Sequence, residues 1–435
     1  MKFRKIGIVG TGYIGTVIAC VLADQGLEIT AIDTNDSRIN DLLNKELGIN
    51  EPGLEEMFKR NYNKIKFSSN IDQLQDSEVI LVTVGTPLDE NLNADLSGIE
   101  EVARNLASII NKDTLICVKS TVVPGTCEKF GKEIERISNL KIGEDFFLAF
   151  SPERLAEGKA IEEFKSFPIV VGSDDHQSRS LAKEFWQKCM GNTVIEVSSF
   201  KAAELTKLAD NLWVDLNVAL ANAISLVAYS FGVNSDEVID AANSLPKGDG
   251  KVNILRSSIG VGGSCLTKDP IFFADIMDSI NVDSSLIRSG RDLNNNMPYE
   301  YCRVVEKWVQ NNQIAEPRVS IIGLSYKSDT DDLRYTPMVE VYKKLKNSFN
   351  LKIFDPIVKQ KDFWKVIGEK VDYSSLEECF EDANIIVLGC AHKGITHKDI
   401  LKHLKNMNNK FVIVDGRGGY AELRKILPKE NYIKI

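Results

Sequence analysis

One cysteine of the chain lies in a setting that suits nucleophilic chemistry. The run from Gly260 to Pro270 (GVGGSCLTKDP) surrounds Cys265 with glycines, which let a backbone approach a ligand closely and leave the thiol uncrowded. Asp269 and Pro270 are typical of an N-cap and a first helical residue, so we expect a helix to begin there. Its positive end would favour the thiolate, the form of cysteine that attacks carbon. The alternative is a loop around a buried, inert cysteine.

A second motif, near the amino terminus, indicates a dinucleotide site. The strand-like run Lys5–Val9 leads into Gly10-Thr-Gly-Tyr-Ile-Gly15 and an apolar helical pattern, and a second strand, Glu28–Ile32, ends at Asp33. The glycines permit the turn, the approach of pyrophosphate and close helix–strand packing, while the helix amino terminus faces the phosphates. Asp33 can accept hydrogen bonds from ribose hydroxyls and would repel a 2′-phosphate, so the motif predicts NAD rather than NADP. A glycine-rich turn with a chance aspartate is the alternative.

Further strand–helix units should follow this motif. Three strand-like runs, Glu78–Val84, Thr114–Lys119 and Phe146–Phe150, are each followed by a polar or glycine-containing turn. Because ligands of parallel sheets lie just past the carboxyl ends of the strands, we expect Thr121, Glu153 and Glu157 near a site. For the two glutamates, a solvated loop and helix start is an equally good interpretation.

A single helix of about thirty residues is predicted over Lys201–Phe231, capped by Ser198 or Ser199. Its apolar stripe comprises Leu205, Leu208, Leu212, Leu216, Ala219 and Ala223, and its polar arc comprises Glu204, Lys207, Asn211, Asp215 and Asn222. A solvated face is the default interpretation of such an arc. Lys207 and Asn211, however, lie one turn apart and could present an ammonium and an amide to a site. The length and the Leu, Ala and Val content of the helix also favour a dimer contact.

A second α/β domain is expected beyond Glu316–Pro317, with basic residues Lys327 and Arg417 just after its strands. The strand-like runs are Arg318–Ile322, Leu351–Phe354, Ile385–Leu388 and Phe411–Val414. The predicted class is therefore α/β, with two Rossmann-like open parallel-sheet domains joined by a central all-helical domain that contains the long helix. The expected limits are 1–197 for the NAD-binding domain, 198–314 for the central domain with the cysteine loop, and 315–435 for the last domain.

Composition narrows the class of partner. The 435 residues suffice for roughly two to four domains. The net charge of −9 argues against nucleic acid, so an anionic substrate must meet locally placed Lys and Arg. Eight scattered cysteines without a C-x-x-C pair, and only four histidines, predict no metal site and a reducing cytoplasm.

The uncharged run Ile6–Ala23 imitates a signal peptide, but its glycines favour strand, turn and helix, and no other segment is apolar enough to cross a membrane.

Taken together, these motifs resemble the UDP-glucose/GDP-mannose dehydrogenase family across essentially the whole chain. The matching segments are Gly10–Gly15, Gly85–Pro87, Lys119–Thr121, Pro152-Glu153 with Glu157-Gly158, Lys207–Asn211, Cys265–Asp269, Gly323–Lys327 with Thr330–Arg334, and Asp415–Arg417. The resemblance implies oxidation of the sixth-carbon alcohol of a nucleotide sugar to a carboxylate, with two NAD and one water.

The resemblance also implies roles for individual residues. Cys265 would attack the aldehyde of the first oxidation, and the thiohemiacetal would be oxidised to a thioester that water hydrolyses. Lys207 and Asn211 would stabilise the oxyanions. Asp269, with a water held by Thr121, would accept protons, and Glu153 would assist hydrolysis.

Binding residues follow from the same resemblance. Those implied for the cofactor are Gly10, Gly12, Tyr13, Ile14, Gly15, Asp33, Arg38, Gly85, Thr86, Pro87, Thr121, Glu157 and Arg334, the last across a homodimer formed through the central helix. Those implied for a UDP-sugar are Glu153, Arg154, Leu155, Lys207, Asn211, Asn253, Arg256, Gly260, Lys327 and Arg417.

The sugar is indicated by a mixture of features. Glu157 and Lys268 resemble the UDP-glucose branch. Arg154, Asp215-x-Asn217, Val252–Leu255 and His392 resemble enzymes acting on UDP-N-acetylhexosamines. Because a cation at position 154 changes the pocket beside the sugar, UDP-N-acetylmannosamine or a relative is favoured over UDP-glucose, with GDP-mannose third.

Two other functions fit parts of the sequence. A 3-hydroxyacid or 6-phosphogluconate type of dehydrogenase also joins a dinucleotide domain to a helical one, but it forms one NADH per product and needs no cysteine nucleophile. A non-catalytic NAD-binding protein would have no need of Thr121, Glu153, Lys207, Asn211, Cys265 and Asp269 together.

Overall fold

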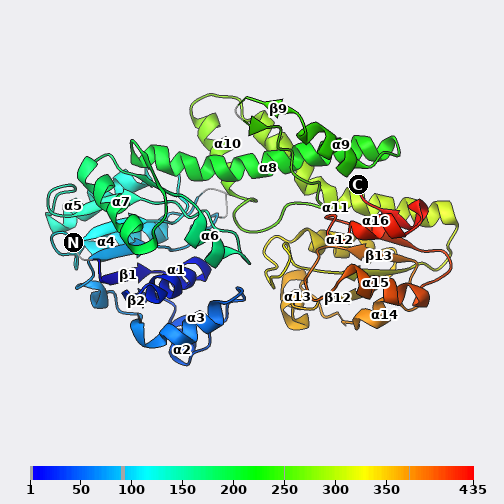
Figure 1. Cartoon of the computed structure of the whole chain (residues 1–435), viewed down its shortest axis with the longest axis horizontal. Helices are drawn as coiled ribbons and strands as arrows, with labels where there is room; N and C mark the ends of the chain where they lie inside the picture. The colour runs from blue at the N-terminus through cyan, green and yellow to red at the C-terminus, as the bar shows by residue number, and fades with distance from the viewer. Residues whose placement is uncertain (1–2, 90–93, 249, 372) are drawn as a thin grey trace. The chain divides into compact units, whose positions relative to one another are not determined.

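The structure is a computed structural model that describes residues 3–89, 94–248, 250–371 and 373–435. The chain forms two compact units, residues 1–209 and 210–435, and one helix, α8 (Phe200–Ser230), runs through the boundary between them. Figure 1 shows the elements of both units along the chain.

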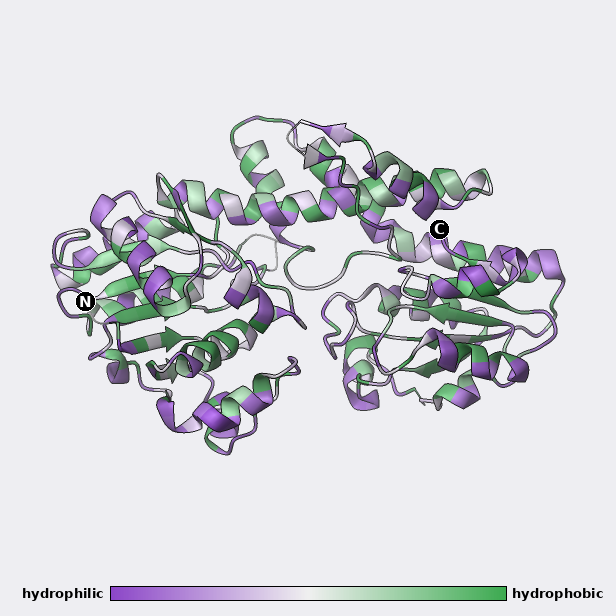
Figure 2. Ribbon diagram, viewed as in Figure 1, coloured by the Kyte–Doolittle hydropathy of each residue, from purple (hydrophilic) through white to green (hydrophobic). Residues whose placement is uncertain are grey.

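The first unit is built on an eight-stranded sheet. Its strand order is β3-β2-β1-β4-β5-β6-β7-β8, and every neighbouring pair is parallel except β6 and β7. The strands are β1 (Lys5–Val9), β2 (Glu28–Ile32), β3 (Ile65–Ser68), β4 (Val79–Val82), β5 (Leu115–Val118), β6 (Phe147–Phe150), β7 (Ile169–Gly172) and β8 (Val194–Val197). The inner strands are nearly all apolar, as Figure 2 shows, because both faces of the sheet are covered.

Helices cover the two faces of this sheet as separate sets. One hydrophobic core packs strand side chains against α1 (Tyr13–Asp24), α2 (Asp36–Leu43), α3 (Leu54–Asn61), α6 (Ala160–Ser166) and α7 (His176–Met190). The other packs them against α4 (Ser97–Ala107), α5 (Thr126–Ser138) and the first turn of α8. The strand order reverses between β1 and β4, so this is the doubly wound arrangement whose ligands bind at the carboxyl edge of the strands.

The second unit begins within α8 and contains three further helices before its sheet. These are α9 (Ser235–Asn243), α10 (Asp269–Ser279) and α11 (Ser285–Asn312), together with a two-residue hairpin of β9 (Pro246–Lys247) and β10 (Gly250–Lys251). The predicted all-helical segment therefore contains one small hairpin. Ser199 Oγ accepts a hydrogen bond from Ala202 N at 3.1 Å, so Ser199 caps α8 as one of the two expected residues.

A five-stranded, wholly parallel sheet completes the second unit. Its order is β12-β11-β13-β14-β15, formed by β11 (Arg318–Ile322), β12 (Asn350–Phe354), β13 (Ile385–Leu388), β14 (Val412–Asp415) and β15 (Tyr432–Ile433). One face packs on α11, α12 (Pro337–Leu345) and α13 (Gln360–Ile367), and the other on α14 (Leu376–Phe380), α15 (His397–His403) and α16 (Glu422–Ile426). The predicted fold class, with two Rossmann-like sheets and a long central helix, is confirmed.

The expectation that no segment beyond Ile6–Ala23 is apolar enough to cross a membrane is wrong: within the described part of the chain, α8 alone has the length and hydropathy of a membrane span. It carries three buried ionisable side chains, Glu204, Lys207 and Asp215, which is typical of a helix that lies in a protein core and makes polar contacts there.

Candidate active site

The glycine loop after β1 has the geometry that a dinucleotide requires. A Cβ added at Gly15 would lie 1.9 Å from the carbonyl oxygen of Gly10, so only glycine allows α1 to pack this closely against the turn. A Cβ added at Gly12 would meet nothing within 4 Å, so the approach to the first turn of α1 is open. An open helix amino terminus of this kind binds a phosphate through backbone N–H groups and the helix dipole.

Asp33 and Arg38 flank this loop as expected, but with different roles. Asp33 follows β2, and its Oδ2 accepts hydrogen bonds from Thr11 N at 2.7 Å and Thr11 Oγ1 at 3.1 Å. The guanidinium of Arg38 donates to Thr11 O, Leu47 O and Thr16 Oγ1, at 3.0, 2.7 and 3.1 Å. Arg38 thus joins the glycine loop to the first turn of α1 and to the segment at Leu47. The contact of Asp33 with a ribose remains a prediction.

Residues after β4, β5 and β6 meet at the same edge of the sheet. Thr86 Oγ1 donates to the carbonyl oxygen of Thr121 at 2.6 Å, which joins two of the predicted cofactor residues. Behind them, the buried Lys119 donates to Ser151 O at 3.0 Å and lies 4.9 Å from the ring centre of Trp186. Burial lowers the pKa of Lys119, and the carboxylate of Glu153 counteracts this shift. Thr121 and Glu153 therefore belong to one strand-end cluster.

A glutamate that the sequence analysis did not single out links the glycine loop to the segment after β6. Glu51 is buried, and it receives hydrogen bonds from the hydroxyl of Tyr13 and, at 2.6 Å, from Gly158 N. Burial and the hydrogen bond to Glu51 raise the pKa of Tyr13 far above its usual value. Glu51 precedes α3 in a loop without any recognisable motif, and only the folded chain brings it to this position.

The segment from Glu153 to Glu157 forms a partly buried loop in the first unit. The Glu153 carboxylate accepts a hydrogen bond from Leu155 N, and Leu155 packs against the core. The Arg154 guanidinium lies 3.5 Å from Pro168 O. The predicted sugar and cofactor contacts of Arg154, Leu155 and Glu157 remain predictions.

Cys265 is the one exposed cysteine among the eight, all of which lie in described segments. Its loop is shaped by glycine: Gly263 has a φ of +87°, and a Cβ there would lie 2.8 Å from the Tyr326 ring. The carbonyl oxygen of Cys265 accepts hydrogen bonds from Lys268 N and Asp269 N, at 3.1 and 2.9 Å, so the thiol lies directly before α10. The prediction of Asp269 as the N-cap is wrong. Lys268 takes that position with no side-chain cap, and Asp269 is the first helical residue.

The Asp269 carboxylate is held by two side-chain donors. It is fully buried, with one oxygen 2.5 Å from Asn211 Nδ2 and the other 2.6 Å from Lys268 Nζ. Two donors on one carboxylate fix its orientation. Asn211, Cys265 and Asp269 are therefore brought together within the second unit. Lys207, buried on α8 one turn before Asn211, belongs to the first unit with Thr121 and Glu153, and the approach of these three to Cys265 stays a prediction.

A cavity of about 330 Å³ opens beside the cysteine loop in the second unit. Its charged lining residues are all cations, namely Arg256, Lys327 and Arg417, and its apolar lining includes Leu266, directly after Cys265. Gly260, Tyr326 and two serines, Ser257 and Ser258, complete the polar part of the wall. Four of the predicted substrate residues thus line one cavity, whose chemistry suits a nucleotide with several phosphates.

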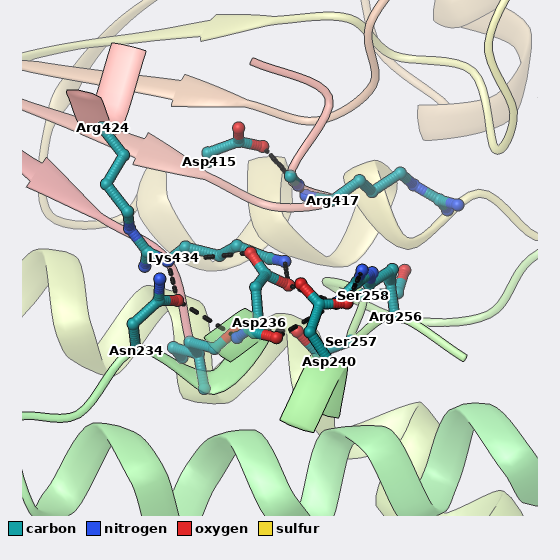
Figure 3. Close-up of polar contacts among 12 residues, drawn as sticks. Asn234, Asp236, Asp240, Arg256, Ser257, Ser258, Asp415, Arg417, Arg424 and Lys434 are labelled. Atoms are coloured by element: carbon teal, nitrogen blue, oxygen red, sulfur yellow. Dashed lines mark hydrogen bonds and ion pairs between the residues drawn. The ribbon is translucent and has the colours of Figure 1, made fainter. Parts of the chain in front are cut away.

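The cations of this cavity differ in how far they are neutralised. Arg417 Nη2 donates to Gly260 O at 3.3 Å, its buried Nε has no hydrogen-bond partner, and no carboxylate among the described residues pairs with it. Figure 3 shows the Arg417 side chain reaching away from Asp415, whose Oδ1 accepts the Arg417 backbone N–H at 3.1 Å. Burial lowers the pKa of Arg417, yet a guanidinium remains charged in proteins. An anionic ligand would supply the partner that Arg417 lacks.

Arg256 is bound to acidic side chains of α9. Its guanidinium contacts the Asp240 carboxylate, donates to Asp236 O at 3.3 Å and lies 3.7 Å from Asp236 Oδ1 (Figure 3). Asp236 also accepts from Lys434 Nζ at 2.6 Å. Arg256 therefore borders the cavity with its charge already compensated, which sequence spacing could not indicate.

Two other predicted binding residues have structural partners as well. Asn253 is exposed, and its carbonyl oxygen accepts a hydrogen bond from Asn217 Nδ2 at 2.7 Å. Arg334 pairs with Asp332 at 2.6 Å in the second unit. The side-chain contact of Asn253 with substrate and that of Arg334 with a cofactor across a dimer remain predictions.

The polar arc of α8 is buried, which corrects the default interpretation of a solvated face. Glu204, Lys207, Asp215 and Asn222 are all buried, whereas apolar residues such as Trp213, Leu220 and Val227 are exposed. Leu205, placed in the apolar stripe, is exposed as well. Glu204 caps α5 by accepting hydrogen bonds from Gly125 N and Cys127 N, at 2.7 and 2.8 Å. The helix therefore turns its polar side inward.

Three possible metal ligands gather below the cavity wall, although the sequence indicated no such clustering. Ligand atoms of Asp355, Cys390 and His392 lie within 4.8 Å of one another and are buried. His392 Nδ1 accepts the N–H of Asp329 at 3.0 Å, so the neutral ring carries its proton on Nε2, 3.2 Å from Asp355 Oδ2. A metal-bound Nε2 would leave a protonated Nδ1 facing that N–H, so the geometry favours a hydrogen-bonded cluster that anchors the loop after β11.

Three family models together match most of the chain. They are described as the NAD binding domain, the central domain and the UDP binding domain of the UDP-glucose/GDP-mannose dehydrogenase family, and match residues 4–190, 201–296 and 320–422. A curated UDP-N-acetyl-D-mannosamine dehydrogenase of Pyrococcus horikoshii is 30% identical over 418 residues, which cover 95% of each chain.

Solved structures agree with this result. A UDP-D-ManNAc dehydrogenase from Pyrococcus horikoshii superposes with a TM-score of 0.85 at 29% identity, covering 99% of this chain and 98% of the other. A UDP-glucose dehydrogenase from Pyrobaculum islandicum gives 0.80 at 25% identity, covering 95% and 94%. The predicted resemblance and the NAD cofactor are confirmed. The chain belongs to the UDP-glucose/GDP-mannose dehydrogenase family of NAD-dependent nucleotide-sugar dehydrogenases.

Proposed function

We propose that this enzyme oxidises the sixth-carbon alcohol of UDP-N-acetylmannosamine to the uronic acid by a four-electron reaction through Cys265. The observation that carries the proposal is the cavity itself, because its lining includes both the cations Lys327 and Arg417 and Leu266, the neighbour of the exposed thiol. A ligand whose phosphates meet the cations would extend toward Cys265.

The first unit fits NAD, which supplies the acceptor for a hydride in each of the two oxidations. The open first turn of α1 would hold the pyrophosphate, and Asp33 would accept hydrogen bonds from a ribose. Thr86 and Thr121, joined at the edge of the sheet, would border the reactive end of the cofactor.

Cys265 divides the overall reaction into two oxidations and a hydrolysis. The alcohol loses two electrons and two protons to give an aldehyde. The Cys265 sulfur then adds to the aldehyde carbon, forming a C–S bond, and the thiol proton goes to the carbonyl oxygen. The thiohemiacetal loses two further electrons and two protons to give a thioester. Water adds to the thioester, the C–S bond breaks, and the products are the carboxylic acid and the free thiol. Covalent capture retains the reactive aldehyde between the two oxidations.

Asn211, Asp269 and Lys207 would supply the supporting groups. The amide of Asn211 and the ammonium of Lys207, one turn apart on α8, would donate to the oxyanion of each intermediate. Asp269, oriented by Asn211 and Lys268, would accept protons through a water held by Thr121, and Glu153 would assist hydrolysis.

The relatives named for UDP-N-acetyl-D-mannosamine support this sugar over UDP-glucose. Arg154, Asp215, Asn217 and His392 support the same choice from the residues. An N-acetylhexosamine carries an acetamido group where glucose has a hydroxyl. The guanidinium of Arg154 would donate a hydrogen bond to the carbonyl oxygen of that acetamido group.

A homodimer through α8 is part of the proposal. The outward side of the helix exposes Trp213, Leu220, Val227 and Phe231, which a second copy would cover. A cytoplasmic location and a role in polysaccharide biosynthesis are consistent with eight free cysteines and with a uronic-acid product.

A substrate panel tests the function. UDP-N-acetylmannosamine, UDP-N-acetylglucosamine, UDP-glucose and GDP-mannose are each incubated with enzyme and NAD, and both NADH and acid are measured. We expect UDP-N-acetylmannosamine to be oxidised with the highest kcat/KM and with two NADH per acid. One NADH per product would indicate a single-step dehydrogenase, and no NADH with any sugar would indicate a non-catalytic protein.

The thioester route has its own test. Cys265→Ser should bind NAD as the wild type does and lose at least a thousandfold in acid formation, because a serine hydroxyl is far less nucleophilic than a thiolate. Acid formation at the wild-type rate in this variant would overturn the route.

A further inference from the structure

The first part of the loop from Asn253 to Leu266 is held by two asparagines of α8, Asn217 and Asn222. Asn217 accepts a hydrogen bond from Leu255 N at 2.8 Å and donates to Asn253 O at 2.7 Å. One and a half turns later, Asn222 Oδ1 accepts from Ser258 N at 2.8 Å. The first part of the loop, which borders the nucleotide cavity, is thus fixed through its backbone by two asparagines.

The last part of the loop is held from α11. Arg291 Nη1 donates to the carbonyl oxygen of Leu266 at 3.2 Å, and the same guanidinium pairs with Asp215 of α8. Asn294 Nδ2 donates to Asp215 O at 2.9 Å and to its Oδ1 at 2.8 Å. Leu266 is the residue after Cys265, so the contact with Arg291 reaches the backbone beside the nucleophile.

One more bond closes the chain of contacts. Asn222 Nδ2 donates to Asn294 Oδ1 at 2.9 Å. The hydrogen bonds therefore run without interruption from Ser258 through Asn222, Asn294, Asp215 and Arg291 to Leu266. We call these four side chains the α8–α11 polar relay.

The α8–α11 polar relay places more polar and charged side chains in the core than packing alone requires. Asp215, Asn222 and Asn294 are fully buried, and the Arg291 side chain is 4% exposed. Burial raises the pKa of Asp215 and lowers that of Arg291, and Asp215 Oδ2 has no hydrogen-bond partner. Apolar side chains would fill this space at lower cost, so the relay is better explained by the positions that it imposes than by the stability that it adds.

We propose that Arg291 is a positioning residue for Cys265: it fixes the end of the cysteine loop through Leu266, while Asn217 and Asn222 fix the part that borders the nucleotide. The inference rests on the proposed function for the roles of the two parts of the loop. The two parts of the loop should therefore affect different kinetic constants. Loss of the Arg291 contact impairs the chemical steps, and loss of the Asn217 contacts impairs substrate binding.

Arg291→Lys is the main test, with Arg288→Lys as its matched control. Lysine retains the positive charge beside Asp215 but has a single ammonium that cannot replace both guanidinium contacts. Arg288 lies on the same helix and pairs at the surface with Asp275 and Asp278, away from the loop. We expect Arg291→Lys to lower kcat about tenfold with less than a threefold change in KM, because a small misplacement of a reacting group is costly. Asn217→Ala should raise KM about tenfold and leave kcat within twofold.

A second variant guards against misfolding. The double variant Asp215→Leu/Arg291→Met removes both charges and restores apolar packing, so it should fold and still show the loss in kcat. Wild-type kcat in this variant, or equal kcat values for Arg291→Lys and Arg288→Lys, would overturn the proposal.

A measurement without substrate separates the inference from the proposed function. The rate of Cys265 alkylation by iodoacetamide is measured on the ligand-free protein, with Cys265→Ser as background. It should rise at least threefold in Arg291→Lys and in the double variant and stay unchanged in Arg288→Lys. This outcome would support the positioning role even if the substrate panel failed, and unchanged alkylation in both variants would refute it even if the panel succeeded.

Discussion

The two sheets of this enzyme present different groups to an anion. In the first unit, β1 passes through the glycine loop directly into α1, so backbone N–H groups and a helix dipole are available at the strand end. In the second unit, β11 is also followed by a glycine, Gly323, but the next helix, α12, begins only at Pro337. There the cavity presents side-chain cations, Lys327 and Arg417.

This difference indicates what each site can tolerate. Backbone recognition depends on close approach, so it is sensitive to the size of one residue and insensitive to charge substitutions. Side-chain recognition depends on charge, so it is sensitive to a single guanidinium and to salt. Two open α/β sheets of different strand order can therefore support anion sites with opposite weaknesses.

The largest effect is expected from Gly15→Ala. The added methyl group would lie 1.9 Å from Gly10 O, so α1 must move away from the turn. We expect loss of NAD binding by at least a hundredfold and a lower Tm of the first unit, measured by titration and by calorimetry. Gly12→Ala is the matched control, because its methyl group has no protein neighbour within 4 Å: the Tm should hold while NAD binding weakens. Equal Tm losses in both variants would contradict this account of the loop.

Arg417→Met should give the next largest effect. Loss of one charge-assisted contact costs about 2 kcal/mol, or about thirtyfold in the Kd of UDP. Calorimetric titration with UDP measures it, and NAD binding should be unaffected. Arg424→Met serves as control, because Arg424 pairs with Asp236 and lies outside the cavity lining. If both variants bound UDP equally well, Arg417 would not be the anion partner.

A smaller effect is expected at Asp33. Asp33→Ser removes the charge that repels a 2′-phosphate and retains a short polar side chain for Thr11 N. The Kd of NAD should rise about fivefold, since one hydrogen bond to a ribose is lost, and the Kd of NADP should fall. Parallel titrations give the ratio of the Kd of NAD to the Kd of NADP in the wild type and in the variant. An unchanged ratio would show that Asp33 does not contact the ribose.

The smallest effect concerns acid stability of the second unit. Burial raises the pKa of Asp355, but hydrogen bonds from His392, Val358 N and Leu324 N outweigh it and hold this pKa below 3.8. A depressed carboxylate pKa adds stability that is present above the unfolded value and is lost as the pH falls through the folded one. The Tm of the second unit should therefore drop below about pH 4, and Asp355→Asn should flatten that drop. A parallel pH profile in the variant would exclude Asp355 as its origin.

Local sequence was sufficient for much of the fold. The limits of β1, β2, β11 and β13 match the predicted runs because each is a short apolar segment that ends at a glycine or an aspartate. By contrast, β8 was not predicted, since Val194–Val197 is short and half exposed, and the antiparallel β6–β7 pair depends on a reversal of the chain that no local pattern encodes.

The candidate site was predictable only in part. Gly260, Lys327 and Arg417 belong to motifs that follow strands or precede a helix, and the structure places all three around one cavity. The burial of Asp215 and Asn222 could not be predicted, since their partners lie more than thirty residues away. The same holds for Glu51 with Gly158 and for Arg256 with Asp236, pairs that only the tertiary fold creates.

The long separation within the α8–α11 polar relay has a consequence for how the protein is made. Asp215 and Arg291 are 76 residues apart, so a ribosome adding 5–20 residues per second adds Asp215 roughly four to fifteen seconds before it adds Arg291. During that interval the nascent helix carries an uncompensated acid on one side and bare apolar residues on the other. The first unit can be completed in that time, but the second has to wait for α11, and chaperone capture of the emerging chain should be concentrated in this window.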